Sequence, residues 1–208
     1  MEITKIEQQK KNKSRYSIFV DGDYVVGVHE SVLFNEHLHV GDKITKEKIS
    51  ELESADARYA AKDAAFHLLK YRQRSVEEMR SRLLNKDFSN DVVAEVIDEL
   101  RIDEYLNDEK FAMTYAEDQV ARKNIGPIRL KAELRKKQLP DKIIEKTVTQ
   151  IYQKHDALEL ARDAAEKKKH SLRKVDYETA YRRLTSYLGR RGFSWDIINE
   201  VVDLEEWR

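Results

Sequence analysis

The sequence predicts a mainly α-helical protein in which three tandem three-helix repeats, stacked into an elongated array, follow a small β-rich segment. A charged fraction of 38% and a hydrophobic fraction of 40%, with only 6 Gly and 2 Pro, suit solvated helices that each bury one apolar stripe. An apolar spacing also recurs at a near-constant period, which indicates an array of similar units. Its three copies are Met79-x3-Leu83-x4-Phe88, Leu130-x3-Leu134-x4-Leu139 and Leu184-x3-Leu188-x4-Phe193. An array presents an extended surface, which favours a binding protein over an enzyme.

Residues 1–50 form the β-rich segment. The stretches Tyr16–Val20 and Tyr24–Val28 are rich in aromatic and β-branched residues, and Asp21-Gly22 separates them. Because Asp-Gly tolerates the positive φ angles of a tight turn, the pattern predicts a β-hairpin. A lone hairpin is marginal in water, so we expect further elements to pack on it. These are a third strand at residues 2–8, a short helix at residues 30–36 and a second helix after Thr45.

Residues 51–106 are the first three-helix repeat. Its first helix is expected to begin at Tyr59 and to run to about Tyr71. Ser75 and Glu78 have capping-box spacing, so the second helix begins there and ends near Lys86. Ser89 or Asn90 caps the third helix, which carries one apolar face.

Residues 107–152 and 153–208 are the second and third repeats. Asn107 is expected to cap a helix over residues 108–123, and Gly126-Pro127 and Pro140 begin the next two helices. The third repeat follows the same plan, with helices at residues 154–169, 176–190 and 194–205. The first helix of every repeat has two alanines one turn apart, which predicts the close approach of a neighbouring helix. These alanines are Ala61 and Ala65, Ala112 and Ala116, and Ala161 and Ala165.

Several classes of function find no support in the sequence. The chain has no cysteine, which excludes disulfides and thiol chemistry. It has no apolar stretch long enough for a bilayer and no signal-peptide core at its N-terminus, so we expect a cytoplasmic protein. Only His37-x-His39 has ligand-like spacing, along one side of a strand, and without a third ligand a surface pair is the better interpretation. No nucleophile elbow or phosphate-binding glycine loop is present, so we expect no catalysis, metal or cofactor.

Basic residues concentrate in the second and third repeats, although the formal net charge is zero. Charge runs on helices are often solvated faces, and that interpretation stays open. The alternative is contact with an anionic partner, since the basic groups recur near the same helix junctions in successive repeats. The candidate residues are Arg122, Lys123, Arg129, Lys131, Arg135, Lys136 and Lys137 in the second repeat, and Lys167, Lys168, Lys169, Arg182, Arg183, Arg190 and Arg191 in the third.

Several of these motifs, taken together over residues 58–205, resemble the RecX family of bacterial recombination regulators. The motifs are Arg74-Ser75-x2-Glu78, Leu106-x-Asp108-x2-Phe111-Ala112-x2-Tyr115, Gly126-x2-Arg129-Leu130-x2-Glu133-Leu134-x-Lys136-Lys137 and Arg190-Arg191-Gly192-Phe193-Ser194. The strand-rich first segment is similar to that of longer family members. A glycine that is typical at the end of the second helix is present as Gly192 but is replaced by Asp87 and Gln138.

The resemblance implies a non-enzymatic modulator of the RecA recombinase, acting in recombination, DNA repair and the SOS response. Family members are elongated, curved helical arrays that lie in the groove of the RecA–single-stranded-DNA filament and also touch DNA. They restrain ATP hydrolysis, strand exchange and filament extension, and a monomer suits such an array. The alternative function is an independent DNA-binding protein that uses one three-helix unit in the helix-turn-helix manner. Binding to bare duplex DNA without the recombinase would distinguish the two.

Overall fold

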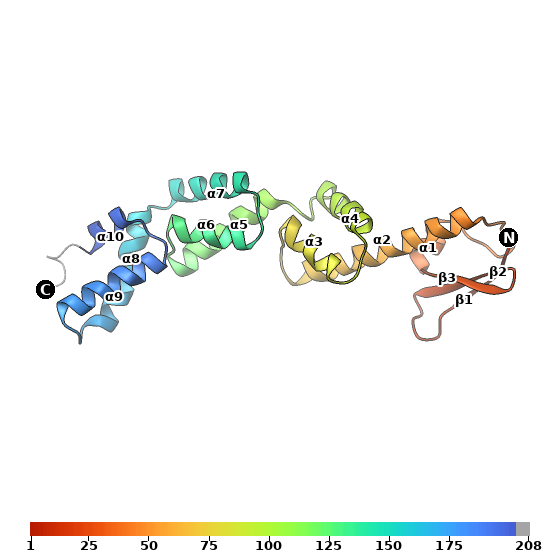
Figure 1. The fold of residues 1–208 in the computed structure, drawn as a ribbon, viewed down its shortest axis with the longest axis horizontal. Helices are drawn as coiled ribbons and strands as arrows, with labels where there is room; N and C mark the ends of the chain where they lie inside the picture. The colour runs from red at the N-terminus through yellow and green to blue at the C-terminus, as the bar shows by residue number, and fades with distance from the viewer. Residues whose placement is uncertain (203–208) are drawn as a thin grey trace. The chain divides into compact units, whose positions relative to one another are not determined.

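The structure is a computed structural model that describes residues 1–202, and Figure 1 shows the order of its helices and strands. It confirms the predicted fold class of a mainly helical chain with a small N-terminal sheet. The chain divides into two compact units. The N-terminal unit comprises residues 1–73 and 79–105, and the C-terminal unit comprises residues 74–78 and the chain from residue 106 onward.

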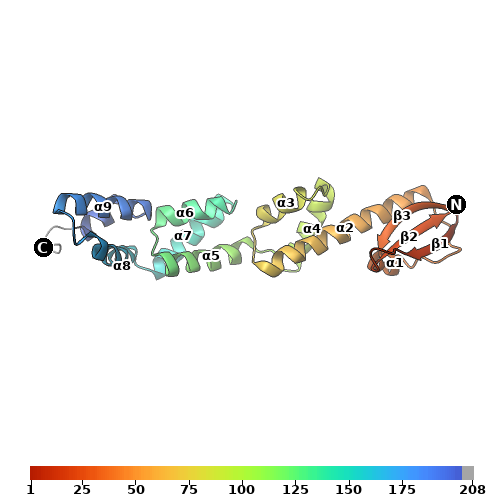
Figure 2. The same ribbon diagram turned by 90° about the horizontal axis from the view of Figure 1, so that it is seen from below.

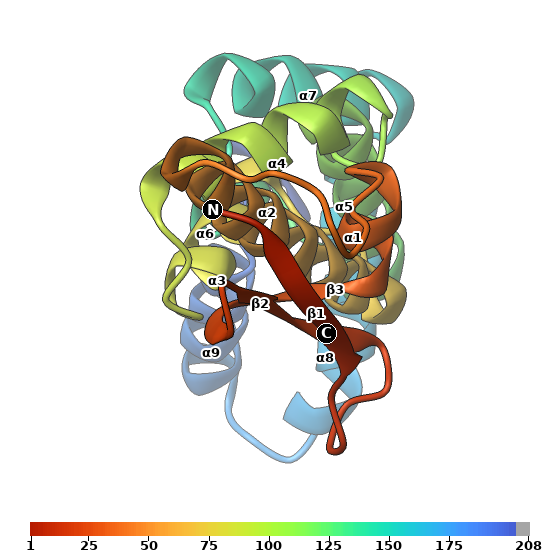
Figure 3. The ribbon, with the colours of Figure 1, turned by 90° about the vertical axis from the view of Figure 1, so that its right-hand side faces the viewer.

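The N-terminal unit begins with a three-stranded antiparallel sheet (Figures 2 and 3). Its strands are β1 (Ile3–Gln8), β2 (Arg15–Val20) and β3 (Asp23–His29), with β2 in the centre. Asp21 and Gly22 join β2 to β3 at φ angles of 50° and 96°. Two consecutive positive φ angles match the right-handed twist of the strands, so the predicted hairpin is confirmed. The predicted third strand is confirmed by β1.

Two helices cover this sheet, α1 (Glu30–Asn35) and α2 (Lys46–Tyr71). The predicted helix after Thr45 is confirmed, and Thr45 caps α2 by accepting a hydrogen bond of 3.2 Å from the Lys48 amide. The expected helix start at Tyr59 is wrong, because α2 is one helix of 26 residues that no Gly or Pro interrupts. Its first half buries Leu52 in the sheet core, and its second half buries Ala61 in the first three-helix repeat.

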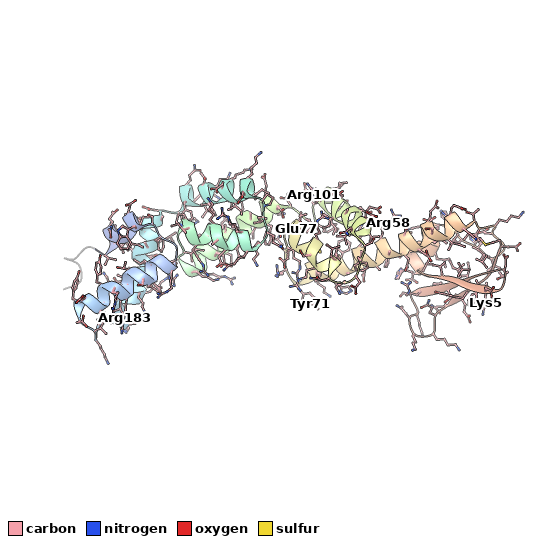
Figure 4. All side chains as sticks on the ribbon, in the orientation of Figure 1. Lys5, Arg58, Tyr71, Glu77, Arg101 and Arg183 are labelled. Atoms are coloured by element: carbon pink, nitrogen blue, oxygen red, sulfur yellow. The ribbon has the colours of Figure 1, made fainter. Side chains whose placement is uncertain are left out.

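That repeat is completed by α3 (Val76–Leu84) and α4 (Asn90–Ile102), with the predicted cap Ser89 before α4. Helix α4 packs against α2, and two ion pairs cross between them. Arg58, which is labelled in Figure 4, contacts Glu95 at 3.2 Å, and Lys62 contacts Glu99 at 2.8 Å. The basic partner is therefore on the first helix of the repeat.

The C-terminal unit contains the second and third repeats. The second consists of α5 (Asp108–Lys123), α6 (Pro127–Lys136) and α7 (Asp141–Lys154), whose starts follow the predicted caps and prolines. The third consists of α8 (Ala157–Lys169), the short 3-10 turn η1 (His170–Leu172), α9 (Tyr177–Arg190) and α10 (Trp195–Val201). The expected start of α8 at residue 154 is wrong, because α7 continues to Lys154 and Asp156 caps α8. The last predicted helix, 194–205, extends partly outside the described residues.

The repeated apolar spacing forms the interior of each repeat. Met79, Leu83, Leu130, Leu134, Leu184 and Leu188 all have no exposed surface. The alanine pairs of α2, α5 and α8 are buried too, and these helices contact α4, α7 and α10 respectively. The close approach of the first and third helices is therefore confirmed in every repeat.

Ion pairs between the first and third helix recur in the other repeats with nearly the same spacing along the chain, which is 37 residues in the first two repeats and 38 in the third. In the second repeat, Glu109 contacts Lys146 at 2.7 Å and Glu117 contacts Lys154 at 3.3 Å, so the acidic partner is now on the first helix. The basic partner returns to the first helix in the third repeat, where Arg162 contacts Glu200 at 3.4 Å.

The second helix of each repeat is followed by a residue in the left-handed region. Asp87, Gln138 and Gly192 have φ angles of 65°, 58° and 83°. The two substitutions of the typical glycine therefore keep its conformation. Within residues 1–202, no helix has the length and apolar character that a membrane span requires.

Candidate functional site

The candidate functional site lies where the end of α9, in the third repeat, meets the start of α6, in the second. Gly126, which precedes α6, offers no side chain to cap the free amides of the first turn. The third repeat supplies backbone acceptors instead: the Gly126 amide donates to the Arg191 carbonyl at 2.8 Å, and the Ile128 amide donates to the Gly192 carbonyl at 3.1 Å. A Cβ on Gly126 would overlap the carbonyl of Gly192, and one on Gly192 would overlap the backbone of Arg129. Both glycines are therefore required by the close approach of two backbones.

A related contact recurs 51 residues earlier, at Ser75. Its hydroxyl donates to the Lys137 carbonyl at 2.6 Å and accepts from the Glu78 amide at 3.1 Å. The two contacts use equivalent positions. Ser75 comes directly before α3, as Gly126 comes directly before α6. Lys137 comes directly before the left-handed residue Gln138, as Arg191 comes directly before Gly192. The predicted N-cap role of Ser75 is confirmed, while the Glu78 carboxylate pairs with Arg74.

A cavity of about 280 Å³ lies beside the Gly126–Arg191 contact. It is lined from α5, the α5–α6 connection, α6 and the end of α9 by Gln119, Lys123, Ile125, Arg129, Glu133, Tyr187, Arg190 and Arg191. Four of these are predicted basic residues, two from each repeat, and Glu133 is the one acidic residue of the lining. The fold thus brings Lys123 and Arg129 together with Arg190 and Arg191.

Arg191 lies at the centre of this arrangement. Its guanidinium packs on the Tyr187 ring, 4.7 Å from the ring centroid, and its Nη1 donates to the Asn124 carbonyl at 3.4 Å. Its Nε is buried without a hydrogen-bond acceptor among the described residues. A buried donor that lacks an acceptor is destabilising, so the protein contacts of Arg191 leave part of the hydrogen-bonding capacity of its guanidinium unused.

The other cations around the cavity differ in their partners. Lys123 Nζ donates to the side-chain carbonyl of Gln119 at 2.7 Å. Arg129 contacts Glu133 at 2.7 Å. Arg190 is exposed and has no carboxylate within 4 Å in residues 1–202. Lys123 and Arg190 therefore keep their positive charge uncompensated.

Tyr152 of α7 holds the connection that forms one side of the cavity. Its hydroxyl donates to the Ile125 carbonyl at 2.6 Å, and burial raises the pKa of this hydroxyl far above its usual value. The phenol therefore stays neutral and keeps donating at physiological pH, which fixes the position of Ile125.

Most of the other predicted basic residues contact groups of their own repeat. Arg122 contacts Asp118 at 2.6 Å, Lys131 contacts Glu145, Arg135 contacts Asp141 at 3.5 Å, Lys136 contacts Glu133 at 3.3 Å and Lys169 contacts Glu166 at 3.4 Å. Lys137 and Lys168 lie over the rings of Tyr115 and Tyr187. Lys167 and the α9 residues Arg182 and Arg183, the latter labelled in Figure 4, have no carboxylate within 4 Å in residues 1–202.

Sequence reasoning missed Gln119, Glu133 and Tyr187 as members of the site. Tyr187 has the spacing of a core residue, yet it precedes Arg190 and Arg191 by about one helical turn. Gln119 and Glu133 likewise lie four residues from Lys123 and Arg129, on the same helix faces. Helical spacing from the basic residues is the signal that would have found them.

No metal site is visible in residues 1–202, because no three His, Asp or Glu residues gather as ligands there. His37 lies in the turn that follows α1, with a φ of 50°, and His39 lies in the irregular stretch after it, so their predicted placement on a strand is wrong. His39 lies 3.8 Å from the Asp42 carboxylate, and both histidines are exposed.

Comparison with known sequence families matches four successive domains to this chain. Residues 1–45 match "Regulatory protein RecX N-terminal domain". Residues 61–100, 107–148 and 155–202 match the first, second and third three-helix domains of RecX.

Similar whole proteins and structures agree with these domain matches. A protein named Regulatory protein RecX from Clostridium botulinum (strain Eklund 17B / Type B) is 30% identical, with 96% of this chain and 94% of the relative covered. A protein of the same name from Bacillus subtilis (strain 168) is 33% identical, with 99% of this chain and 77% of the relative covered. A crystal structure of regulatory protein RecX gives a TM-score of 0.77 at 27% identity, with 98% of this chain and 99% of the other covered. The crystal structure of RecX from Lactobacillus salivarius gives a TM-score of 0.65 at 27% identity, with 74% of this chain and 97% of the other covered.

Proposed function

Because this chain belongs to the RecX family of regulatory proteins, we propose that it binds the filament of RecA on single-stranded DNA and inhibits it. The inhibited activities are ATP hydrolysis, strand exchange and filament extension, and through them the protein modulates recombination and DNA repair. It acts as a monomer, by binding and without a catalytic step of its own.

The observation that carries this proposal is the uncompensated positive charge of the second and third repeats. Lys123 and Arg190 project from the cavity lining, and Lys167, Arg182 and Arg183 add three more cations on α8 and α9. These cations make no ion pair within 4 Å in residues 1–202, although Lys123 donates to Gln119, and hydrogen bonds together with the charge of Arg182 lower the pKa of Asp176. Cations without an ion pair are available to the acidic groups of a protein–DNA filament. Successive similar repeats also suit a periodic partner, since several weak contacts made at once favour the filament over a free subunit.

Charge reversal on α8 and α9 tests the proposal. The variant Lys167→Glu/Arg182→Glu/Arg183→Glu should weaken inhibition of the DNA-dependent ATPase of RecA by at least about tenfold, because each reversal replaces attraction by repulsion. The measurement is the protein concentration that halves ATP hydrolysis on single-stranded DNA at fixed salt.

The matched control reverses Lys10, Lys11 and Lys13, three exposed lysines in the β1–β2 connection. It changes the net charge by the same amount and should inhibit like the unchanged protein. Full inhibition by the α8–α9 variant would contradict the proposal. Tight binding to bare duplex DNA without RecA would favour the alternative of an independent DNA-binding protein.

A further inference from the structure

We propose that the cavity between the second and third repeats is a phosphate-binding site, in which one phosphate group bridges Lys123 and Arg129 of one repeat to Arg190 and Arg191 of the next. The site rests on its own geometry and needs no recombinase. It assigns a defined ligand chemistry to one place in the chain, whereas the proposed function concerns the wider basic surface.

The charge of the lining favours an anion. Four basic side chains face one acid, Glu133, and this carboxylate is already contacted by Arg129 at 2.7 Å and by Lys136 at 3.3 Å. Its charge is therefore compensated from within α6, and the cavity keeps a positive potential.

The hydrogen-bond donors favour an oxyanion in particular. The guanidinium of Arg191 has five N–H donors, of which Nε is buried without an acceptor and Nη1 makes one long bond of 3.4 Å. Arg190 has no carboxylate within 4 Å in the described chain, and Lys123 donates to one amide oxygen only. Tetrahedral phosphate offers oxygens in several directions, so it can accept from donors on both sides of the cavity, whereas a carboxylate has two oxygens in one plane.

The site is held in position before any ligand arrives. Tyr152 fixes Ile125 through a 2.6 Å bond, and the Gly126 and Ile128 amides are bonded to the carbonyls of Arg191 and Gly192. Walls that are already ordered lose little entropy on binding. The volume of about 280 Å³ is many times what one water molecule needs, so a phosphate fits with part of its hydration.

Titration of the full chain with inorganic phosphate tests the site. Ionic strength is held constant with sodium chloride, and binding is followed by the midpoint of thermal unfolding and by the ³¹P line width of phosphate. Because a ligand that binds only the folded state stabilises it, the midpoint should rise by about 5 °C at a hundred times the dissociation constant. The double variant Lys123→Gln/Arg190→Gln should bind phosphate at least about tenfold more weakly, because two charged donors are lost.

The matched control is Arg182→Gln/Arg183→Gln, which removes the same charge from α9 outside the cavity lining. It should retain the phosphate response of the unchanged protein. Circular dichroism in chloride shows whether each variant folds. Should the double variant fail to fold, Lys123→Gln alone serves as the test, since this side chain is exposed and its one direct partner is Gln119.

A single-stranded oligothymidylate then identifies the source of the phosphate. Displacement of inorganic phosphate by the oligonucleotide in the unchanged protein, and not in the double variant, assigns the site to the DNA backbone. Retention of phosphate assigns it to a free phosphate. Three outcomes would contradict the proposed phosphate site. They are an equal phosphate response in all three proteins, no response in the unchanged protein, and an equal response to glutamate in place of phosphate. None of these results depends on inhibition of RecA, so the two proposals fail separately.

Discussion

At the scale of single residues, the backbone conformation after the second helix is the same in all three repeats, although the residue type differs. Asp87 and Gln138 adopt the same left-handed backbone as Gly192, although a side chain there costs about 1 kcal/mol or more. Each of the three residues ends the second helix of a repeat. Only Gly192 is also pressed against the backbone of Arg129, which is a second reason for glycine at that position.

Replacing Gln138 by glycine should therefore stabilise the protein. Gln138 is exposed, so its side chain contributes little packing, and relief of the strained φ should raise the free energy of unfolding by about 0.5–1 kcal/mol. Urea unfolding followed by circular dichroism measures the change. Gln138→Ala keeps the Cβ and should give no gain. Equal stabilisation by alanine and glycine would show that backbone strain is not the cause.

At the scale of helices, ion pairs between the first and third helix of a repeat supplement the apolar contact. Lys62 and Glu99 are about one-third and one-half exposed, so solvent screens their attraction. The hydrogen bond to Glu99 raises the pKa of Lys62 above its usual value. Because the pKa of Lys62 is raised on folding, the stabilisation that this ion pair contributes is present at neutral pH. It is lost as the pH rises through the pKa of Lys62 in the folded protein.

Reversing one partner of this pair should destabilise the N-terminal unit, and reversing both should restore it. Lys62→Glu places a carboxylate opposite Glu99 and should lower the free energy of unfolding by about 0.5–1 kcal/mol. The double variant Lys62→Glu/Glu99→Lys should recover most of that loss. The four corners of this cycle are compared by urea unfolding at neutral pH and low salt. A double variant no more stable than the single one would show that the pair does not couple.

The sequence predicted most helix starts because their signals are local. Thr45, Ser89 and Asn107 each cap a helix with their own side chain, a few residues from the amide that they accept. The cavity could not be predicted in this way. Its two sides meet through backbone carbonyls of Arg191 and Gly192, which have no signature in residue type, and so the basic residues could be named but not grouped.

At the scale of the whole molecule, the second and third repeats of the C-terminal unit are joined through backbone contacts. The third repeat caps the first turn of α6, and within the same unit the Ser75 hydroxyl donates to the Lys137 carbonyl, which follows α6. Leu160 of α8 also packs against the core of the second repeat. Stability of the second repeat therefore depends on its neighbour, as in other repeat proteins.

Gly126→Ala should loosen this connection. The φ of Gly126 is −88°, which alanine adopts freely, so only the overlap with Gly192 and Phe193 opposes the substitution. Overpacking of this kind costs about 1–3 kcal/mol of unfolding free energy. Gly189→Ala is the control, because it lies inside α9 with one ordinary contact and should stabilise by about 0.5–1 kcal/mol. Thermal unfolding of both variants measures the difference, and equal effects would contradict the close-approach argument.

The reversed polarity of the ion pairs in the second repeat bears on folding fidelity. Three similar repeats in one chain can exchange helices during synthesis, a common route to misfolded multi-repeat proteins. Pairing α2 with α7 would set Arg58 opposite Lys146, and pairing α5 with α4 would set Glu109 opposite Glu95, so each mistaken partnership between these adjacent repeats brings like charges together. Between these two adjacent repeats correct partners attract and incorrect ones repel, which disfavours an exchange of helices between the first and the second repeat.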